Sequence, residues 1–410
     1  ASPHKAGTAY LAANRYQRAD RAPYVYKTDD YGRTWTKIVR GLPPDDFARA
    51  IREDEQRPGL LFLGTEHGIY VSFDDGAYWQ SLRLNLPVTP VHDIDVKDDD
   101  LVIGTHGRGF YVLDNISVLR QLTPEITAAD VHLFRPATAT RSVSRGVAID
   151  YYLKNAADKV TIEILAADGT LVRSFTGTPA EAKEPAPAER AEAGEEESGP
   201  RFGPPRPPRV GTRAGMNRFT WDMRYAPATD FPGMILWAAS TRGPIAPPGT
   251  YQVRLTVGGQ SRTERFQIRR HPLFRATDAD LLEQFRLAKQ INERVDEANR
   301  TVIRIRAIKD QIADRTSKAK DKRITAAGEA LAAKLTDVEG EIYQYRNRSN
   351  QDPLNYPIKL NNKLAALQSL VESGDARPTD QSYAVFKELS QRLDAEIARL
   401  QQLLRTELPA

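Results

Sequence analysis

The sequence contains no cysteine among its 410 residues, only three methionines and only six histidines. The absence of cysteine excludes disulfides, a thiolate nucleophile and zinc sites that use cysteine ligands. The histidines form no HExxH or HxxxH pair, which excludes a zincin-type centre. No apolar run is long enough to span a membrane. We therefore expect no metal, no cofactor and no membrane span.

An excess of one charge sign is also missing. The chain carries 58 basic and 54 acidic side chains, which gives a formal net charge of +4. A surface that binds phosphates needs basic residues clustered on one side. The one dense basic run is RTSKAKDKR (315–323), and its composition is typical of a solvated turn between helices. We expect no nucleic-acid partner.

The first part of the chain contains an internal repeat. TDDYGRTW (28–35) and SFDDGAYW (72–79) share the pattern S/T-x-D-x-G-x-x-W, 44 positions apart, and a degenerate third copy ends at Asp114. A short apolar run lies before each copy, and each copy begins within a second one. Short strands that recur every 40–45 residues or so predict the blades of a β-propeller.

This pattern is the Asp-box, and residues 1–122 resemble the Asp-box (BNR) propellers of sialidases, xyloglucanases and sortilin-type receptors. The segments GTEHGIYVSFDDG, PVHDIDV and GTHGRGFYVLDNIS resemble most the sortilin-like propellers of secreted bacterial proteins. Proteins of that group are often labelled glycosyl hydrolase by similarity. The resemblance implies a secreted, periplasmic or cell-surface protein. It also implies that the box residues are structural: Asp and Gly close a hairpin turn, and Trp fills a gap between strands or blades. These residues are Thr28, Asp30, Gly32, Trp35, Ser72, Asp74, Gly76 and Trp79.

Residues 1–122 supply two full repeats and part of a third, whereas a closed propeller needs at least about four blades. The chain starts at Ala1, without an initiator methionine, at a point inside a repeat. We therefore expect it to be the C-terminal part of a propeller protein. The remaining blades would lie on the same precursor or on a separate chain.

Three loops of the predicted propeller carry polar side chains towards one rim. His67, His92, His106 and Arg108 are candidates for binding a peptide, protein or glycan ligand. In the alternative, Glu66 and Asp93 would be the catalytic carboxylates of a glycoside hydrolase whose active site lies mostly on the missing blades. Their separation would then be about 5–5.5 Å for a retaining enzyme or about 6.5–9.5 Å for an inverting one. The simplest interpretation is that these side chains only form hydrogen bonds with backbone groups at the ends of the strands.

Residues 123–272 predict a β-sandwich. Alternating strands begin at AIDYYL (148–153) and end at RTERFQIRR (262–270), and GMNRFTWDMRY followed by PPGTYQVRL resembles immunoglobulin-like or fibronectin-like modules. Trp221 and Tyr251 are predicted core residues. A Pro/Glu/Ala-rich stretch, 178–210, predicts an insertion without its own core. The apolar stretch FPGMILW (231–237) is expected to pack on the propeller or on a partner.

Residues 273–410 switch to an apolar period of about 3.5, which predicts amphipathic helices. The expected spans are 277–316 and 324–347, with further helices from Pro357 and from Thr379. Together they predict an antiparallel four-helix bundle, whose stripe could also serve as a homo-oligomer seam. The predicted fold class is mainly β plus α: partial propeller blades, a sandwich and a helical bundle. A purely structural surface or filament subunit is a third functional hypothesis.

Overall fold

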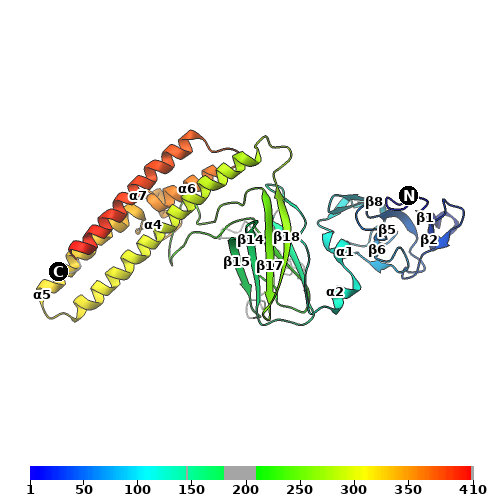
Figure 1. The fold of residues 1–410 in the computed structure, drawn as a ribbon, viewed down its shortest axis with the longest axis horizontal. Coiled ribbons are helices and arrows are strands. Elements are labelled where there is room, and N and C mark those ends of the chain that lie inside the picture. Colours follow the sequence, from blue (N-terminus) through cyan, green and yellow to red (C-terminus); the bar gives the residue numbers. More distant parts are fainter. Residues whose placement is uncertain (145, 180–208, 408–410) are drawn as a thin grey trace. The chain divides into compact units, whose positions relative to one another are not determined.

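A computed structural model describes residues 1–144, 146–179 and 209–407. The chain folds as two compact units, residues 1–137 and 138–410 (Figure 1). Several antiparallel sheets precede a helical C-terminal region, so the predicted combination of β and α structure is confirmed at this level. The first unit extends beyond the predicted boundary at 122, and most of the predicted insertion (180–208) lies outside the described residues.

The first unit contains three antiparallel sheets, here called the first, second and third sheet. Two short helices, α1 (Ser117–Gln121) and α2 (Pro124–Ala128), and β11 (Val131–Leu133) follow them. In chain order, the first sheet consists of β1 (Ala9–Arg15), β2 (Asp20–Thr28) and β3 (Thr36–Lys37); the second of β4 (Ala48–Glu53), β5 (Leu61–Thr65), β6 (Ile69–Ser72) and β7 (Gln80–Ser81); and the third of β8 (Val91–Lys97), β9 (Asp100–Thr105) and β10 (Phe110–Leu113).

The three sheets repeat one another in detail. One backbone hydrogen bond recurs at the same place in each: Tyr31 N to Gly7 O (3.0 Å), Asp75 N to Gly59 O (2.9 Å) and Ile116 N to Asp99 O (2.7 Å). The middle strand of the second sheet, β5, is buried on both faces, and its apolar sequence LFLGT fits that position. The repeat found in the sequence is therefore also a repeat of backbone geometry.

Trp79 joins the first and second sheets. Its side chain is 1 % exposed, its indole Nε1 donates to Ile38 O (2.9 Å) and its backbone N donates to Arg40 O (2.9 Å). Gly41 lies so close that a Cβ there would meet Trp79 O at 2.3 Å. Trp35, the equivalent residue one repeat earlier, is 43 % exposed. The two tryptophans of the repeat thus have different surroundings.

The second unit begins with two sheets. One is five-stranded, in the order β12-β18-β17-β14-β15, and the other contains the antiparallel pair β13–β16. Figure 1 shows β14, β17 and β18 side by side. The bounds are β12 (Ala139–Thr140), β13 (Val147–Leu153), β14 (Val160–Ala166), β15 (Leu171–Gly177), β16 (Gly215–Trp221), β17 (Gly249–Val257) and β18 (Gln260–Arg269).

Aromatic side chains fill the space between these two sheets. Trp221 on β16 is fully buried and its ring lies 5.8 Å from that of Tyr251 on β17. Phe175 on β15 and Phe219 on β16 have ring centroids 4.7 Å apart. Both polar tips are satisfied, since the Tyr251 hydroxyl donates to Pro247 O and the Trp221 indole to Arg224 O. The structure thus places Trp221 and Tyr251 in a core.

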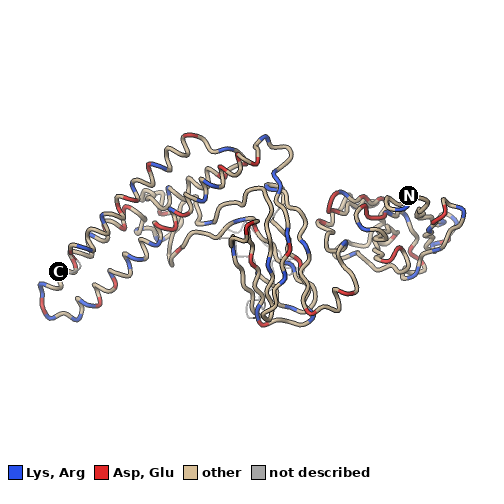
Figure 2. Tube along the Cα trace, viewed as in Figure 1, with Lys and Arg blue, Asp and Glu red and all other residues tan. Residues whose placement is uncertain are grey.

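Four helices with one shared apolar core follow: α4 (Asp278–Lys318), α5 (Lys322–Ile342), α6 (Leu360–Val371) and α7 (Asp380–Thr406). Thr277 caps α4 through a capping box with Asp280. Apolar residues from all four helices line this core, and Figure 2 shows basic and acidic residues intermixed along the same helices. No helix in the described ranges combines the length and apolar character that a membrane crossing requires.

Two expectations for this region are wrong. The second helix ends at Ile342 rather than near 347, because Tyr343 adopts an extended backbone and packs its ring edge-on against Phe231. The stretch 231–237 was expected to pack on the propeller or on a partner. Instead, Phe231, Met234 and Leu236 pack into the helical core of their own unit. A loop between two sandwich strands therefore supplies part of the bundle's interior.

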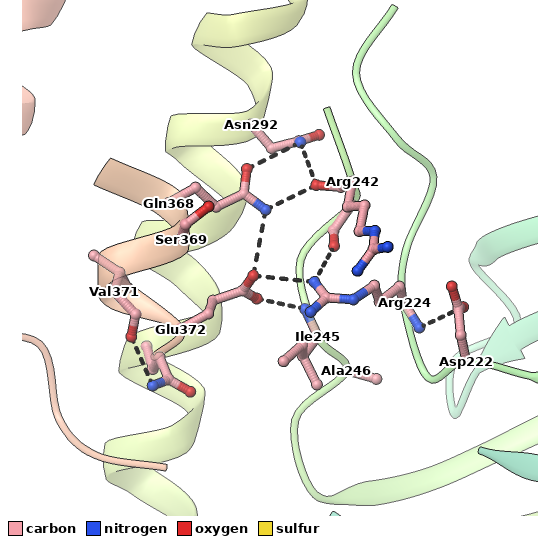
Figure 3. A network of polar contacts seen from close by, with 12 residues as sticks. Asp222, Arg224, Arg242, Ile245, Ala246, Asn292, Gln368, Ser369, Val371 and Glu372 are labelled. Atoms are coloured by element: carbon pink, nitrogen blue, oxygen red, sulfur yellow. Dashed lines mark hydrogen bonds and ion pairs between the residues drawn. The ribbon is translucent and has the colours of Figure 1, made fainter. Parts of the chain in front are cut away.

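A polar network fixes the loop that contains this stretch (Figure 3). Glu372, at the end of α6, accepts hydrogen bonds from the Arg224 guanidinium (3.1 Å) and from Ile245 N (2.6 Å). Asn292 of α4 and Gln368 of α6 both donate to the backbone oxygen of Arg242. Because these bonds join the loop to two helices, sandwich and helices form one unit.

Candidate functional site

The polar loop residues and the Asp-boxes lie at opposite ends of the strands. The boxes occupy the β2–β3 and β6–β7 turns, whereas the loops β1–β2, β5–β6 and β9–β10 lie at the other end of their hairpins. These second loops carry a 3-10 turn (Tyr16–Arg18), Glu66–Gly68 and His106–Gly109. Any site formed by the predicted histidines is therefore separate from the boxes.

The boxes use their polar groups internally. Thr28 Oγ1 donates to Asp30 and accepts from Gly32 N (2.9 Å), while Asp30 also accepts from Thr34 N (2.9 Å). Gly32 and Gly76 both have φ of 84°, in the region that favours glycine. The second box repeats these bonds with Ser72, Asp74, Gly76 and Tyr78. With its hydrogen bonds directed into its own turn, each box is built to hold a hairpin.

The first box predicts a pH-dependent stability. Hydrogen bonds from the Thr34 hydroxyl and backbone and from Thr28 lower the pKa of Asp30 to about 2. An unfolded aspartate titrates near about 3.9, so the stabilisation is complete above that pH and is lost as pH falls towards 2. Carboxyl-carbon NMR should show Asp30 titrating near 2. A midpoint near 4 would show that these hydrogen bonds do not hold the carboxylate.

The site on the opposite side is organised by Arg49, which the sequence reasoning missed. Arg49 lies at a bulge between Ala48 and Ala50 in β4, and both its Nε (2.8 Å) and Nη2 (2.5 Å) donate to Glu66 Oε2. Its guanidinium also lies over the rings of Phe47 (4.8 Å) and Tyr16 (5.4 Å), which stack on each other. Glu66 is thus one half of a fixed ion pair beside an aromatic platform.

His67 is held by a buried carboxylate. Its Nδ1 lies 3.1 Å from Asp46 Oδ1, which also accepts from the His67 backbone N. Thr65 Oγ1 and the Tyr70 hydroxyl donate to the other oxygen of Asp46. Burial, with the adjacent Asp46 charge, raises the pKa of Tyr70 to about 12, so the phenol stays a donor. Asp46 positions the His67 loop, a role that spacing in the sequence could not indicate.

His92 and His106 form a pair, with ring centroids 5.0 Å apart. His92 was expected in a loop, but it lies within β8, beside the bulge at Val91–Asp93. Burial first, then the charges of Arg49 and His106, lower the pKa of His92, while Glu66 opposes the shift. The two imidazoles and the Arg49–Glu66 pair are therefore close enough to interact electrostatically.

Asp93 and Arg108 lie in more open positions. The Asp93 side chain is 79 % exposed and lies 3.9 Å from an Arg52 nitrogen, so the two candidate carboxylates have different arginine neighbours. Arg108 is exposed at the tip of its hairpin, between Gly107 and Gly109, which both have positive φ. The structure thus pairs Glu66 with Arg49, places His92 within reach of their charges and of the His106 ring, and gives Asp93 a separate ion pair.

This arrangement can offer a ligand aromatic surface, imidazole donors and acceptors, and a preoriented ion pair. Among the described residues, no three His, Asp or Glu side chains gather as a metal site would require. The loops are held in place by backbone bonds such as His106 N to Pro90 O (3.0 Å) and Glu66 N to Phe47 O (3.1 Å). Such anchoring suits recognition, because little ordering is needed on binding.

Comparisons with known proteins give no family. No family model and no curated protein matches the chain. Among solved structures, an ancestral GH74 enzyme is 10 % identical, with a TM-score of 0.23, over 65 % of this chain and 30 % of that one. A GH74 xyloglucanase from Xanthomonas campestris is 15 % identical, with a TM-score of 0.23, over 64 % of this chain and 37 % of that one.

CopC from Methylosinus trichosporium OB3b is 12 % identical, with a TM-score of 0.17, over 35 % of this chain and 98 % of that one. The chain spans about a third of the length of the GH74 enzymes that it matches. These TM-scores are too low to support an argument about fold or function.

Proposed function

We propose that the first unit is part of an Asp-box propeller that lies outside the cytoplasm. Its loops β1–β2, β5–β6 and β9–β10 bind a peptide, protein or glycan. The sandwich, with an immunoglobulin-like topology, and the helices would then act as assembly modules. The propeller assignment is supported by the backbone hydrogen bond that recurs in three successive sheets and by Trp79 between two of them. Loops on one side of successive blades converge, which is where such folds bind ligands.

The Arg49–Glu66 ion pair carries the binding proposal. Three successive sheets contribute to its surroundings: Tyr16 from the first, Phe47 from the second, and His92 with His106 from the third. The Arg49 and Glu66 side chains lie 2.5 Å apart on a loop face, beside a partly exposed tyrosine that stacks on Phe47. Hydrogen bonding of the strand ends alone does not require such an arrangement. The pair presents charge, and the platform presents ring faces, to the same ligand.

The exposed surface of the first sheet supports a further sheet next to it. Trp35 is 43 % exposed although Trp79, its equivalent, is buried by the first sheet, and Tyr31 and Leu11 are also exposed. We therefore propose that another Asp-box sheet, from the same precursor or a separate chain, covers Trp35 as the first sheet covers Trp79. This sheet would be the partner that completes the propeller.

A binding screen on glycan and peptide arrays, followed by calorimetry with the strongest ligand, tests the function. Arg49→Met keeps the aliphatic stem but removes the guanidinium and leaves Glu66 unpaired. We expect it to weaken binding at least about tenfold, because a charged group that has lost its partner must be desolvated. Lys97→Met, an equivalent change at an exposed residue of β8, is the control and should bind as the unaltered chain does.

Two results would contradict this proposal. Equal affinity of the Arg49 and Lys97 variants would remove the ion pair from the site. Cleavage of a glycan ligand by the full chain, lost in Glu66→Gln, would instead favour the glycoside hydrolase alternative. Mass spectrometry of the ligand after incubation distinguishes this second case.

A further inference from the structure

An apolar cavity of about 80 Å³ opens beside β10 in the third sheet. Among the described residues β10 pairs only with β9, so its other edge is free. Phe110 and Val112 on this strand are 83 % and 53 % exposed. The cavity is lined by Ile69, Leu82, Arg83, Leu84, Asn85, Leu86, Leu101, Ile103, Tyr111, Val112 and Leu113.

The interface between the first and second sheets shows what belongs in this cavity. There Trp79 packs in a cluster whose members include Val25, Ile38, Val39, Leu42, Leu61, Leu63 and Tyr70. Strand register relates these to the third sheet, since Leu63 pairs with Tyr70 as Ile103 pairs with Tyr111. The counterparts of the seven, one repeat later, are Ile69, Leu82, Arg83, Leu86, Leu101, Ile103 and Tyr111, and all of them line the cavity.

The indole itself has no counterpart in the third sheet. After β10 the chain turns at Asp114 and Asn115, bonds Ile116 N to Asp99 O and enters α1 instead of returning along the edge. The cavity therefore has the wall residues of the Trp79 site without the tryptophan. We call it the indole socket, with the lining given above.

At the socket, the backbone oxygens that correspond to the two acceptors of Trp79 are free. Trp79 donates to Ile38 O and Arg40 O, whose counterparts are Leu82 O and Leu84 O. Neither of these oxygens accepts a hydrogen bond from the described residues. In the second sheet, Leu82, which follows the outer strand β7, donates its backbone N–H to Ile69 O of β6. The counterpart of Ile69 on β10 is Phe110, so Phe110 O is the acceptor that an added outer strand would use. Exposed acceptors along a strand edge are a template for a further strand.

We propose that the indole socket and the free edge of β10 bind an extended strand from a partner polypeptide. This strand carries a tryptophan followed by two polar residues. The tryptophan fills the socket and donates its N–H to Leu82 O, while the polar pair continues along β10. The chain's own outer strands have this composition, as Trp35-Thr36-Lys37 and Trp79-Gln80-Ser81. Main-chain bonds give such strand addition its affinity, and the side-chain pocket gives its specificity.

The test uses the full chain and a labelled peptide with the sequence of residues 77–84, AYWQSLRL, followed by fluorescence anisotropy. We expect saturable binding. The peptide variant W79A should bind at least about tenfold more weakly, because it lacks the indole that fills the socket. In the protein, Leu82→Glu places a carboxylate in the socket wall and should cause a similar loss. Val88→Glu, at an exposed position outside the lining, should leave binding unchanged.

The W79A peptide leaves the protein unaltered, so this comparison holds even where Leu82→Glu disturbs folding. Equal binding of both peptides would overturn the proposal, as would absence of binding at millimolar peptide. Dimerisation of the chain that Leu82→Glu abolishes would also overturn it, because a second copy would then occupy the socket. Sedimentation velocity detects that case.

Discussion

Replacing Trp79 by alanine is expected to destabilise the first unit by about 3–5 kcal/mol, the usual cost of truncating a large buried aromatic side chain. The indole is 1 % exposed, packs between the first and second sheets, and donates to Ile38 O. Since the chain has two units, a single global transition would mix them. Hydrogen exchange of β2, β5 and β6 in increasing urea reports the first unit alone.

Trp35→Ala is the matched control for this prediction. It removes the same side chain from the same position of the repeat, but Trp35 is 43 % exposed and its indole donates only to Gly32 within its own turn. We expect a cost below about 1.5 kcal/mol in this chain, because little apolar area returns to water. Equal losses for the two variants would show that the tryptophans stabilise their own turns rather than a contact between sheets.

The second large effect is expected at the Arg141–Asp375 ion pair within the second unit. Arg141 Nε donates to Asp375 Oδ1 (2.7 Å), and both side chains are at most 5 % exposed. The same guanidinium donates to Ala246 O and to Gln284 of α4, so it ties sandwich to helix. Asp375→Ala leaves a buried guanidinium without its counter-charge, which typically costs about 3–5 kcal/mol.

Asp314→Ala is the control, because Asp314 also pairs with one cation, Lys318 (2.7 Å), but both side chains are mostly exposed. An exposed pair of this spacing contributes about 0.3–0.5 kcal/mol. Urea denaturation followed by helix circular dichroism measures both variants. A loss for Asp375→Ala no larger than for Asp314→Ala would mean that the sandwich and helices do not depend on this ion pair.

Regular patterns in the sequence were the best guide to the fold. The resemblance to the Asp-box implied hairpin turns, and the β2–β3 and β6–β7 turns lie where the two boxes stand, because Asp and Gly act locally. The period of the last 130 residues or so predicted helices whose stripes line one core, since 3.6 residues per turn fixes which side chains share a face. The helix starts expected at Thr277 and Thr379 agree with the structure, in which these two residues cap α4 and α7.

Contacts between distant segments were not predictable in this way. Arg49 and Asp46 lie in one segment, yet their partners Glu66 and His67 become neighbours only when β4 pairs with β5. The bulge that presents Arg49 has no signature in the residues themselves. The stretch 231–237 was expected on another surface because its sequence shows only that it is apolar. The helices that cover it are encoded far downstream.

The central claim is that the face carrying the Arg49–Glu66 pair, His92 and His106 binds a ligand. Ring spectra of the chain labelled with 15N-histidine test it most directly, before and after addition of the ligand found by the array screen. The account predicts that the His92 and His106 resonances move together on binding, while His271, in the second unit, stays in place. Saturable binding that leaves both His92 and His106 unchanged would contradict the account.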